Sequence, residues 1–382
     1  MKLRSLLLEA GWSGADLARA VNALGTRQGL RLRYDRTAVG HWLAGSCPSP
    51  PVPDFVAQCL SRRLGREIIA ADAGLAAASG PSAAPPSLAG LARGDQLLRH
   101  ASYLPSPLTV GSIAHGEAHA RGDLLVAEHF VRLYGALGGG HVRTALVTYI
   151  ADKAPTSAPL GFLLATMTAD TRSQGLAYEY YRATLTVADP DIAALSLRAM
   201  SVQAQRLGHP LAAAYAEAAL QLPTSPAVRA FLYTGRAATR EPRAALRDLA
   251  CAENLMEEPG SRAGALQQYP RAGFDYQKGV VLRRAGDPRG ALRAFESSLR
   301  HRPPENLRAV LLTRAHLAEL LLASGHLDAA CEHWQHFLSA PSVESFLVRR
   351  ARSRMQALLA PYGRSRQAAD LLVRSRTGKG GS

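Results

Sequence analysis

The clearest pattern of apolar and polar positions lies in residues 274–303, and it predicts two short helices joined by a tight turn. Val280–Leu282 give the first helix an apolar face. Gly286 can adopt the left-handed conformation that ends a helix, because it has no Cβ to clash. Asp287 can then cap the second helix, with Pro288 at its first position. This stretch therefore predicts a helical hairpin.

Ala291, Phe295 and Leu299 recur every four residues, so they form one stripe on the second helix, which Pro303 ends. Together with Gly279, these residues fall at the spacing of the tetratricopeptide repeat (TPR), which the stretch resembles. The resemblance implies that neighbouring helix pairs cover its apolar face, since one unit cannot bury that face alone. The Trp, Leu and Tyr positions of the TPR pattern hold Asp275, Lys278 and Leu282.

The same offsets recur elsewhere in the second half of the chain. Gly325 and Trp334 repeat the positions of the turn glycine and the aromatic residue, and Gly208 repeats the glycine alone. The small-residue markers are spaced irregularly, between 32 and 46 residues apart: Ala177, Ala213, Ala245, Ala291 and Ala330. We therefore expect degenerate TPR-like repeats that form an α-solenoid over residues 116–374.

First helices of TPR units direct their inner positions towards a bound segment. The repeat offsets place five residues there: Arg198, Gln205, Tyr276, Arg283 and Glu319. Two arginines in a groove would suit a peptide carboxylate or acidic side chains. The alternative is a solvated inner face without a ligand.

The N-terminal residues predict a separate helical domain over residues 1–75. Apolar positions at helical spacing indicate helices over residues 3–10, 14–25, 36–45, 54–64 and 67–73. Ser13 and Asp35 are expected to cap the second and third helices, and Gly25 is expected to end the second. Scarce strand signals and abundant Ala and Leu make the whole chain all-α.

The third of these helices has two faces. Val39, Trp42 and Leu43 share the apolar one, while the other carries Arg36, Thr37, Gly40 and His41. With Leu17 and Ala18 in the preceding helix and Gly45 at the end, this resembles helix-turn-helix domains of the Cro/CI-repressor (XRE) class. The resemblance implies that the third helix reads the major groove. Arg36 could then donate two parallel hydrogen bonds to guanine.

The chain departs from that family by an insert of about ten residues, TRQGLRLRYD, between the two helices. Its alternation of apolar and basic residues could form a short extended segment that presents Arg31 and Arg33 to phosphates. The alternative to DNA binding is a helical domain that serves protein contact only.

Residues 76–115 are rich in Ala, Ser, Gly and Pro and predict a flexible linker, with a transient helix over residues 91–98. Residues 375–382 predict a disordered basic tail. The order of a helix-turn-helix and then TPR-like repeats resembles cytoplasmic regulators of Gram-positive bacteria whose repeats bind signalling peptides. Phrases such as LRLRYDRTAVGHWLAG resemble a group of actinobacterial TPR transcriptional regulators, which implies control of development or secondary metabolism.

Charge and composition narrow the partners. The net charge of +15 favours an anionic partner, nucleic acid first, although a GC-rich genome would also explain the excess of arginine over lysine. Four scattered cysteines indicate a reduced compartment. Since Glu9 interrupts the first apolar run and no run approaches the ~20 residues of a membrane span, we expect a cytoplasmic protein without membrane contact.

Candidate sites for chemistry are weak. His115 and His119 flank Glu117 at spacing that does not match a zinc protease, and Cys331 lies off the face shared by His333 and His336. Gly138–Gly140 indicates a helix break, with an anion cradle as the alternative. We expect no metal, no cofactor and no enzymatic activity.

The leading hypothesis is a homodimeric transcriptional regulator that binds double-stranded DNA. Its TPR domain would sense a peptide, a small molecule or a partner protein. The alternative is a TPR adaptor without sequence-specific DNA binding. An enzyme built on helical repeats is a third hypothesis that no residue pattern supports.

Overall fold

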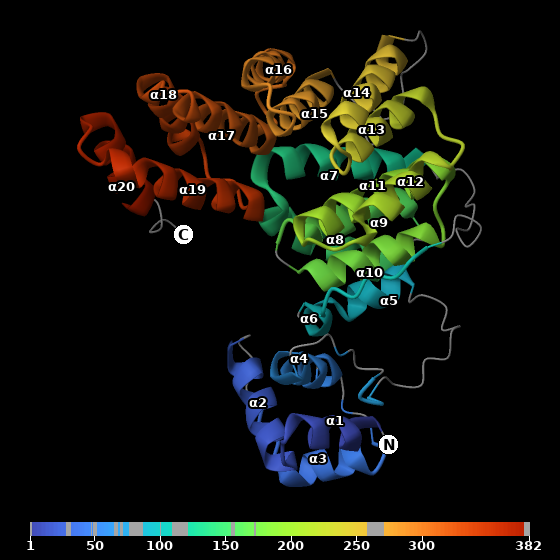
Figure 1. The fold of residues 1–382 in the computed structure, drawn as a ribbon. Coiled ribbons are helices and arrows are strands. Elements are labelled where there is room, and N and C mark those ends of the chain that lie inside the picture. Colours follow the sequence, from blue (N-terminus) through green and yellow to red (C-terminus); the bar gives the residue numbers. More distant parts are fainter. Residues whose placement is uncertain are drawn as a thin grey trace. The chain divides into compact units, whose positions relative to one another are not determined.

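The computed structural model is all-α, with no strand among the residues it describes. It describes the chain except residues 1, 28–31, 47, 49–51, 65–67, 69–71, 76–86, 100, 109–120, 154–156, 172, 258–270 and 378–382. The chain forms two compact units (Figure 1). One is Met1–Ala84 with His100–Ser102, and the other is Pro85–Arg99 with Tyr103–Ser382.

The N-terminal unit contains α1 (Lys2–Ala10), α2 (Gly14–Arg27), α3 (Arg36–Leu43) and α4 (Val52–Leu64). Ser13 caps α2 as expected: the Asp16 amide donates to Ser13 Oγ, and the Ser13 amide donates to Asp16 Oδ2. The prediction that Gly25 ends α2 is wrong, because the helix continues to Arg27. The expected fifth helix lies largely outside the described residues, and Ile68 and Asp72–Gly74 are not helical.

These helices enclose one core of leucine, valine and aromatic side chains. Leu17 and Val21 of α2, Val39 of α3 and Leu60 of α4 are fully buried in it. Gly14 lets α2 approach α3, since a Cβ there would already touch Val39 Cγ1 at 3.4 Å. The helix spacing read from the apolar positions therefore places α3 with one face inward.

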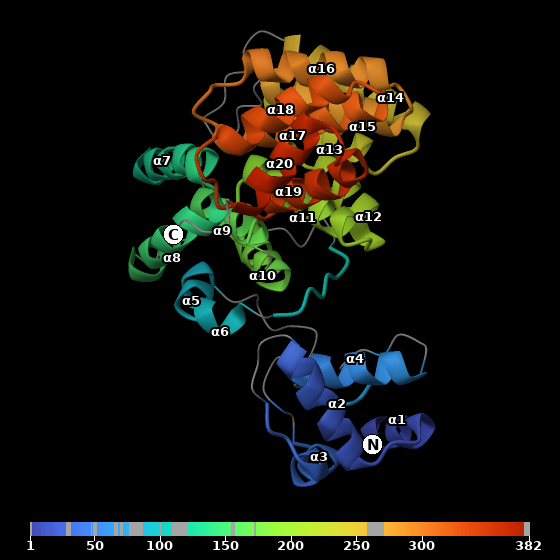
Figure 2. The same cartoon turned by 90° about the vertical axis from the view of Figure 1, so that its left-hand side faces the viewer.

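The second unit is a TPR-like α-solenoid, in which each helix packs against the next to form stacked pairs (Figures 1 and 2). The main pairs are α9 (Ala158–Ala169) with α10 (Gln174–Leu185), α11 (Pro190–Arg206) with α12 (Leu211–Leu220), α13 (Pro226–Ala237) with α14 (Pro242–Glu257), α15 (Arg271–Arg284) with α16 (Pro288–His301), and α17 (Leu307–Ala323) with α18 (Leu327–Ser339). The pair α7 (Arg121–Leu137) and α8 (Gly139–Lys153) precedes them, and α19 (Phe346–Leu359) and α20 (Arg366–Thr377) follow. None of the helices described could cross a membrane on its length and apolarity.

The pair α15/α16 forms by the turn chemistry that its sequence predicts. Gly286 has φ +83°, and Asp287 Oδ1 accepts a hydrogen bond of 2.8 Å from the Gly290 amide. Gly279 is needed for close packing, because a Cβ there would lie 2.8 Å from the ring of Phe295. Phe295 is fully buried as a result.

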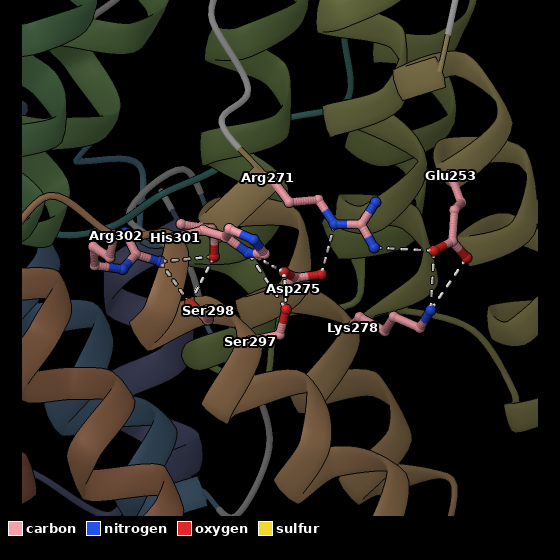
Figure 3. Close-up of polar contacts among 9 residues, drawn as sticks. Glu253, Arg271, Asp275, Lys278, Ser297, Ser298, His301 and Arg302 are labelled. Carbon is pink, nitrogen blue, oxygen red and sulfur yellow. Dashed lines mark hydrogen bonds and ion pairs between the residues drawn. The ribbon is translucent and has the colours of Figure 1, made fainter.

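A buried polar network replaces the missing aromatic residues of the repeat (Figure 3). Asp275, at the Trp position of the pattern, is 2% exposed and accepts hydrogen bonds from Arg271 Nε (3.1 Å) and Ser297 Oγ (2.7 Å). Lys278 Nζ lies 3.1 Å from Glu253 of α14, which ties this pair to its neighbour. The departure from the consensus is therefore compensated by ion pairs that join α14, α15 and α16.

One repeat has a different register from the predicted one. Ala213, expected to be the packed small residue of α12, is exposed. The buried residues are instead Ala212, Tyr215, Ala216 and Ala219. After Gly208 (φ +70°), α12 begins only at Leu211, behind Pro210, so the face turned towards α11 is shifted by one residue.

The linker prediction needs correction at residues 85–99, which belong to the second unit. Helices α5 (Leu88–Arg93) and α6 (Asp95–Leu98) lie there, and α5 packs on α8 and α10. Leu88 sits on Gly161 of α9, where a Cβ would lie 2.7 Å from a Leu88 methyl group. Asp95 is 2% exposed, forms an ion pair with Arg143, and accepts 2.9 Å from Tyr180 Oη. The other linker residues, 76–84 and 109–115, lie outside the described part.

The solenoid closes on itself, because α7 packs against α17 and against the strand-like turn before α19. The Gly140 amide donates to Glu344 O, and the Glu344 amide donates to Leu137 O, both at 2.8 Å. Gly138 has φ +85°, and a Cβ there would lie 2.5 Å from Glu344 O. The predicted helix break is thus confirmed, and the anion-cradle alternative is wrong, since a carbonyl occupies the Gly140 amide.

Asp170 is the polar centre of this closure and is 3% exposed. Its carboxylate accepts hydrogen bonds from Arg308 Nε of α17 (2.9 Å) and Ser345 Oγ (2.8 Å). Its main-chain carbonyl accepts 2.9 Å from the Phe346 amide. One residue at the end of α9 therefore holds two later segments of the chain.

The predicted tail begins later than expected. Helix α20 continues to Thr377, and Ser375 within it is fully buried. Gln356 Nε2 donates a hydrogen bond of 3.0 Å to Ser375 Oγ, which fixes α20 on α19. Residues 378–382 lie outside the described part of the chain.

Replacing Asp170 with Ala tests the closure. We expect the free energy of unfolding to fall by about 3 kcal/mol, because Arg308 and Ser345 lose a buried partner. Asp152→Ala, at an exposed position of α8, is the control and should change stability by less than about 0.5 kcal/mol. Equal denaturant midpoints for the two variants would contradict this account of the closure.

Candidate functional site

The exposed face of α3 is the first candidate site. Arg36, Thr37, Gly40 and His41 are all exposed, whereas Val39 and Trp42 are buried. Leu17 and Ala18 are buried in the same core, and Leu43 packs against its edge. Asp35 caps α3, since its Oδ1 accepts 2.8 Å from the Ala38 amide. The structure therefore gathers the four polar residues on one accessible helical surface.

The insert between α2 and α3 is fixed by a side chain that sequence reasoning missed. Asn22 Nδ2 donates 2.8 Å to Tyr34 O, and the Tyr34 amide donates 3.0 Å to Asn22 Oδ1. The Tyr34 ring meets Trp42 edge-on, with centroids 5.1 Å apart. These contacts define the entry of the chain into α3. A polar residue among the apolar positions of α2 was the available signal.

The alternation expected of the insert is visible in its described end. Leu32 and Tyr34 are half-buried, whereas Arg33 is exposed. Within the described residues neither Arg33 nor Arg36 makes a hydrogen bond or an ion pair. Arg31 lies outside the described residues. Two guanidinium groups are therefore available beside the exposed face of α3.

The second candidate site lies on the first helices of the repeats. Three of the five residues predicted there come together: Tyr276 and Arg283 of α15, and Glu319 of α17. Arg283 Nη1 donates 2.8 Å to Glu319 Oε2, and Glu319 is 5% exposed. Arg354 of α19 forms a second ion pair with the same carboxylate. Glu319 therefore already has two cationic partners.

His316 links these residues, although the sequence analysis did not single it out. Its Nδ1 lies 3.3 Å from Arg283 Nη1 and its Nε2 lies 3.1 Å from Tyr276 Oη. Since a guanidinium only donates, Nδ1 accepts and Nε2 carries the proton. The imidazole ring stacks on Phe295 with centroids 5.0 Å apart. Burial lowers the pKa of His316 to about 4, so the ring is neutral at physiological pH.

The other two predicted residues face α13 instead. Arg198 is 9% exposed, its guanidinium lies 3.4 Å from the centroid of Phe231, and its Nε donates 3.1 Å to Phe231 O. Gln205 is exposed and donates to Ala238 O. Both side chains therefore join α11 to α13, and the structure does not bring them together with Tyr276, Arg283 and Glu319.

Within the described residues, no group of three or more His, Cys, Asp or Glu side chains is placed to hold a metal ion. Burial raises the pKa of the Cys331 thiol and lowers that of His333. His115 and His119 lie outside the described residues.

The family model of the SP15 N-terminal domain matches residues 3–76. This match covers the helices of the N-terminal unit and stops before the repeats. No curated protein matches the chain.

Among solved structures, the chain is similar to the crystal structure of the APC/C hetero-tetramer Cut9-Hcn1, with a TM-score of 0.41 and 17% sequence identity. The match covers 66% of this chain and 48% of that chain, so this chain spans about half the length of that protein. The assignment of the fold rests on the helix pairs themselves.

His316 predicts a pH dependence of stability. Its pKa is lowered in the folded protein, so the unfolded chain binds a proton first as the pH falls below about 6.5. The stabilisation is fully present above that pH. It should be lost towards pH 4 by at most about 1.4 kcal/mol per pH unit. Chemical denaturation of His316→Gln should show a flatter profile over this range. His326→Gln, at an exposed position, should retain the slope of the unmodified protein.

Proposed function

We propose that this protein is a cytoplasmic transcriptional regulator of the helix-turn-helix (XRE) type, in which the N-terminal unit binds double-stranded DNA and the TPR-like unit senses a ligand. The observation that carries the proposal is the exposed face of α3, with Arg36, Thr37, Gly40 and His41 on a helix whose other face is buried. A protruding helix of this kind fits the major groove.

The charge around α3 supports the same proposal. Arg33 and Arg36 are exposed, and the described part of the chain gives neither an acidic partner. Arg36 would read a guanine edge, and Arg31 and Arg33 would bind phosphates. Asn22 and Tyr34 would act as positioning residues, because they fix the chain at the start of α3.

The TPR-like unit would regulate DNA binding by taking up a peptide, a small molecule or a partner protein, and it would mediate homodimerisation. Arg283, His316 and Tyr276 offer polar groups on the inner side of the repeats. A two-fold dimer would bind two half-sites about one helical turn apart. By the resemblance to actinobacterial TPR regulators, the controlled genes would belong to development or secondary metabolism.

The alternative, a TPR adaptor without DNA binding, is separated by one experiment. The full-length protein is incubated with a random double-stranded DNA pool, and bound sequences are recovered and counted. Enrichment of a palindromic sequence is expected of a dimeric regulator. Recovery without enrichment, together with a stoichiometric protein partner from cell extract, would favour the adaptor.

Replacing both Arg36 and His41 with Ala should abolish the sequence preference, since each good base contact contributes about 1–3 kcal/mol of discrimination. The control is Arg62→Ala, an exposed arginine of α4, which also lowers the positive charge but leaves α3 intact. Fluorescence anisotropy with the selected site and a scrambled site measures the ratio of the two affinities. A ratio that survives in the double variant contradicts the assignment of α3.

A further inference from the structure

Arg206, the last residue of α11, is the starting point for an inference about the ligand. It is exposed, and within the described residues it has no hydrogen-bond or ion-pair partner. It nevertheless lies within electrostatic reach of Tyr276 of α15, Arg308 of α17 and Tyr134 of α7. We name Arg206, Arg308, Tyr134 and Tyr276 the arginine–tyrosine cluster.

The cluster is built by the closure of the solenoid, since its four residues come from four helices that are distant in sequence. The Arg308 guanidinium lies over the Tyr134 ring, 4.7 Å from its centroid. The packing of α7 against α17 brings these two residues together. Tyr276 is held by the contact of its Oη with His316. The positions of three cluster members are thus fixed by printed-strength contacts, and Arg206 projects among them.

The surroundings of Arg206 are poor in water although its side chain retains exposure. Desolvation lowers the pKa of Arg206. Burial raises the pKa of Tyr134 and of Tyr276, so both phenols stay neutral at physiological pH. The tyrosines therefore offer O–H groups as hydrogen-bond donors but cannot supply the negative charge that Arg206 lacks.

The one carboxylate close to Arg206 is already used. Asp170 lies within electrostatic reach of Arg206, but it accepts hydrogen bonds from Arg308 and Ser345 in the closure. Glu319, the other acid near Tyr276, has Arg283 and Arg354 as partners. A guanidinium carries five N–H donors and keeps its charge, so a desolvated one without a partner favours binding of an anion.

We propose that the arginine–tyrosine cluster is a binding site for the anionic group of a ligand, a carboxylate or a phosphate. Arg206 forms the ion pair, Arg308 adds positive charge from the opposite wall, and the Tyr134 and Tyr276 hydroxyl groups are available as donors. The site deepens the proposed sensing role of the TPR-like unit and rests on it for its biological meaning. Its chemistry can be tested without knowing the natural ligand.

The experiment measures binding of two anions, tripolyphosphate and citrate, to the full-length protein by isothermal titration calorimetry at low chloride concentration. The two probes separate a phosphate ligand from a carboxylate ligand. We expect Arg206→Gln to weaken binding of the preferred probe at least tenfold. Arg206→Lys should retain most of the affinity, because the charge remains. Arg293→Gln, at an exposed position of α16, is the matched control and should bind as the unmodified protein does.

Three results would overturn the site: no binding of either probe at millimolar concentration, equal affinities for Arg206→Gln and Arg293→Gln, or a loss of binding in Arg36→Ala, which would place the anion on the N-terminal unit. Circular dichroism of each variant checks that the helices are retained. The affinity of every variant for the selected DNA is measured in parallel. If the site fails while DNA is still bound, the regulator proposal stands. If the anion is bound while no DNA sequence is enriched, the site stands without it.

Discussion

The second unit depends on the contacts of Asp170. Helix pairs of a solenoid expose apolar faces at both ends of the array, and an open array must cover them with polar capping helices. Here the first and last pairs cover each other in part, because Asp170 joins the end of α9 to α17 and to the turn before α19. The glycines 138–140 make that approach sterically possible, since side chains there would collide with Glu344 and Met167.

The individual helix pairs could be predicted from the sequence because their determinants are local. A turn glycine with positive φ, a capping aspartate and an apolar stripe lie within one stretch of about 30 residues in α15 and α16. The same reasoning failed for Ala213, where Pro210 delays the start of α12 and rotates the helix. It also failed for residues 88–98, whose composition resembles a linker. Their burial depends on a place for Leu88 that Gly161, more than 70 residues later, provides.

The candidate sites divide along the same line. The exposed face of α3 follows from helical periodicity alone, and the structure places Arg36, Thr37, Gly40 and His41 as the pattern indicates. The inner surface of the repeats was only partly foreseen. Tyr276, Arg283 and Glu319 do come together, but Arg198 is taken up by Phe231 because α13 lies against it. Arg206 has no local signal, since its neighbours on α7, α15 and α17 are brought there by the closure.

Closure and anion binding are connected through Arg308. Its guanidinium binds Asp170 in the closure and belongs to the arginine–tyrosine cluster. Burial acts to lower the pKa of Arg308, but Tyr134 and Asp170 raise it above its usual value, so this residue keeps its charge in both roles. An anion bound beside Arg206 attracts the same guanidinium that Asp170 holds. Any difference in its affinity for the closed and the opened array must appear, by thermodynamic linkage, as an equal change in the stability of the closure. A ligand at this place would therefore act on the contact that joins the two ends of the solenoid.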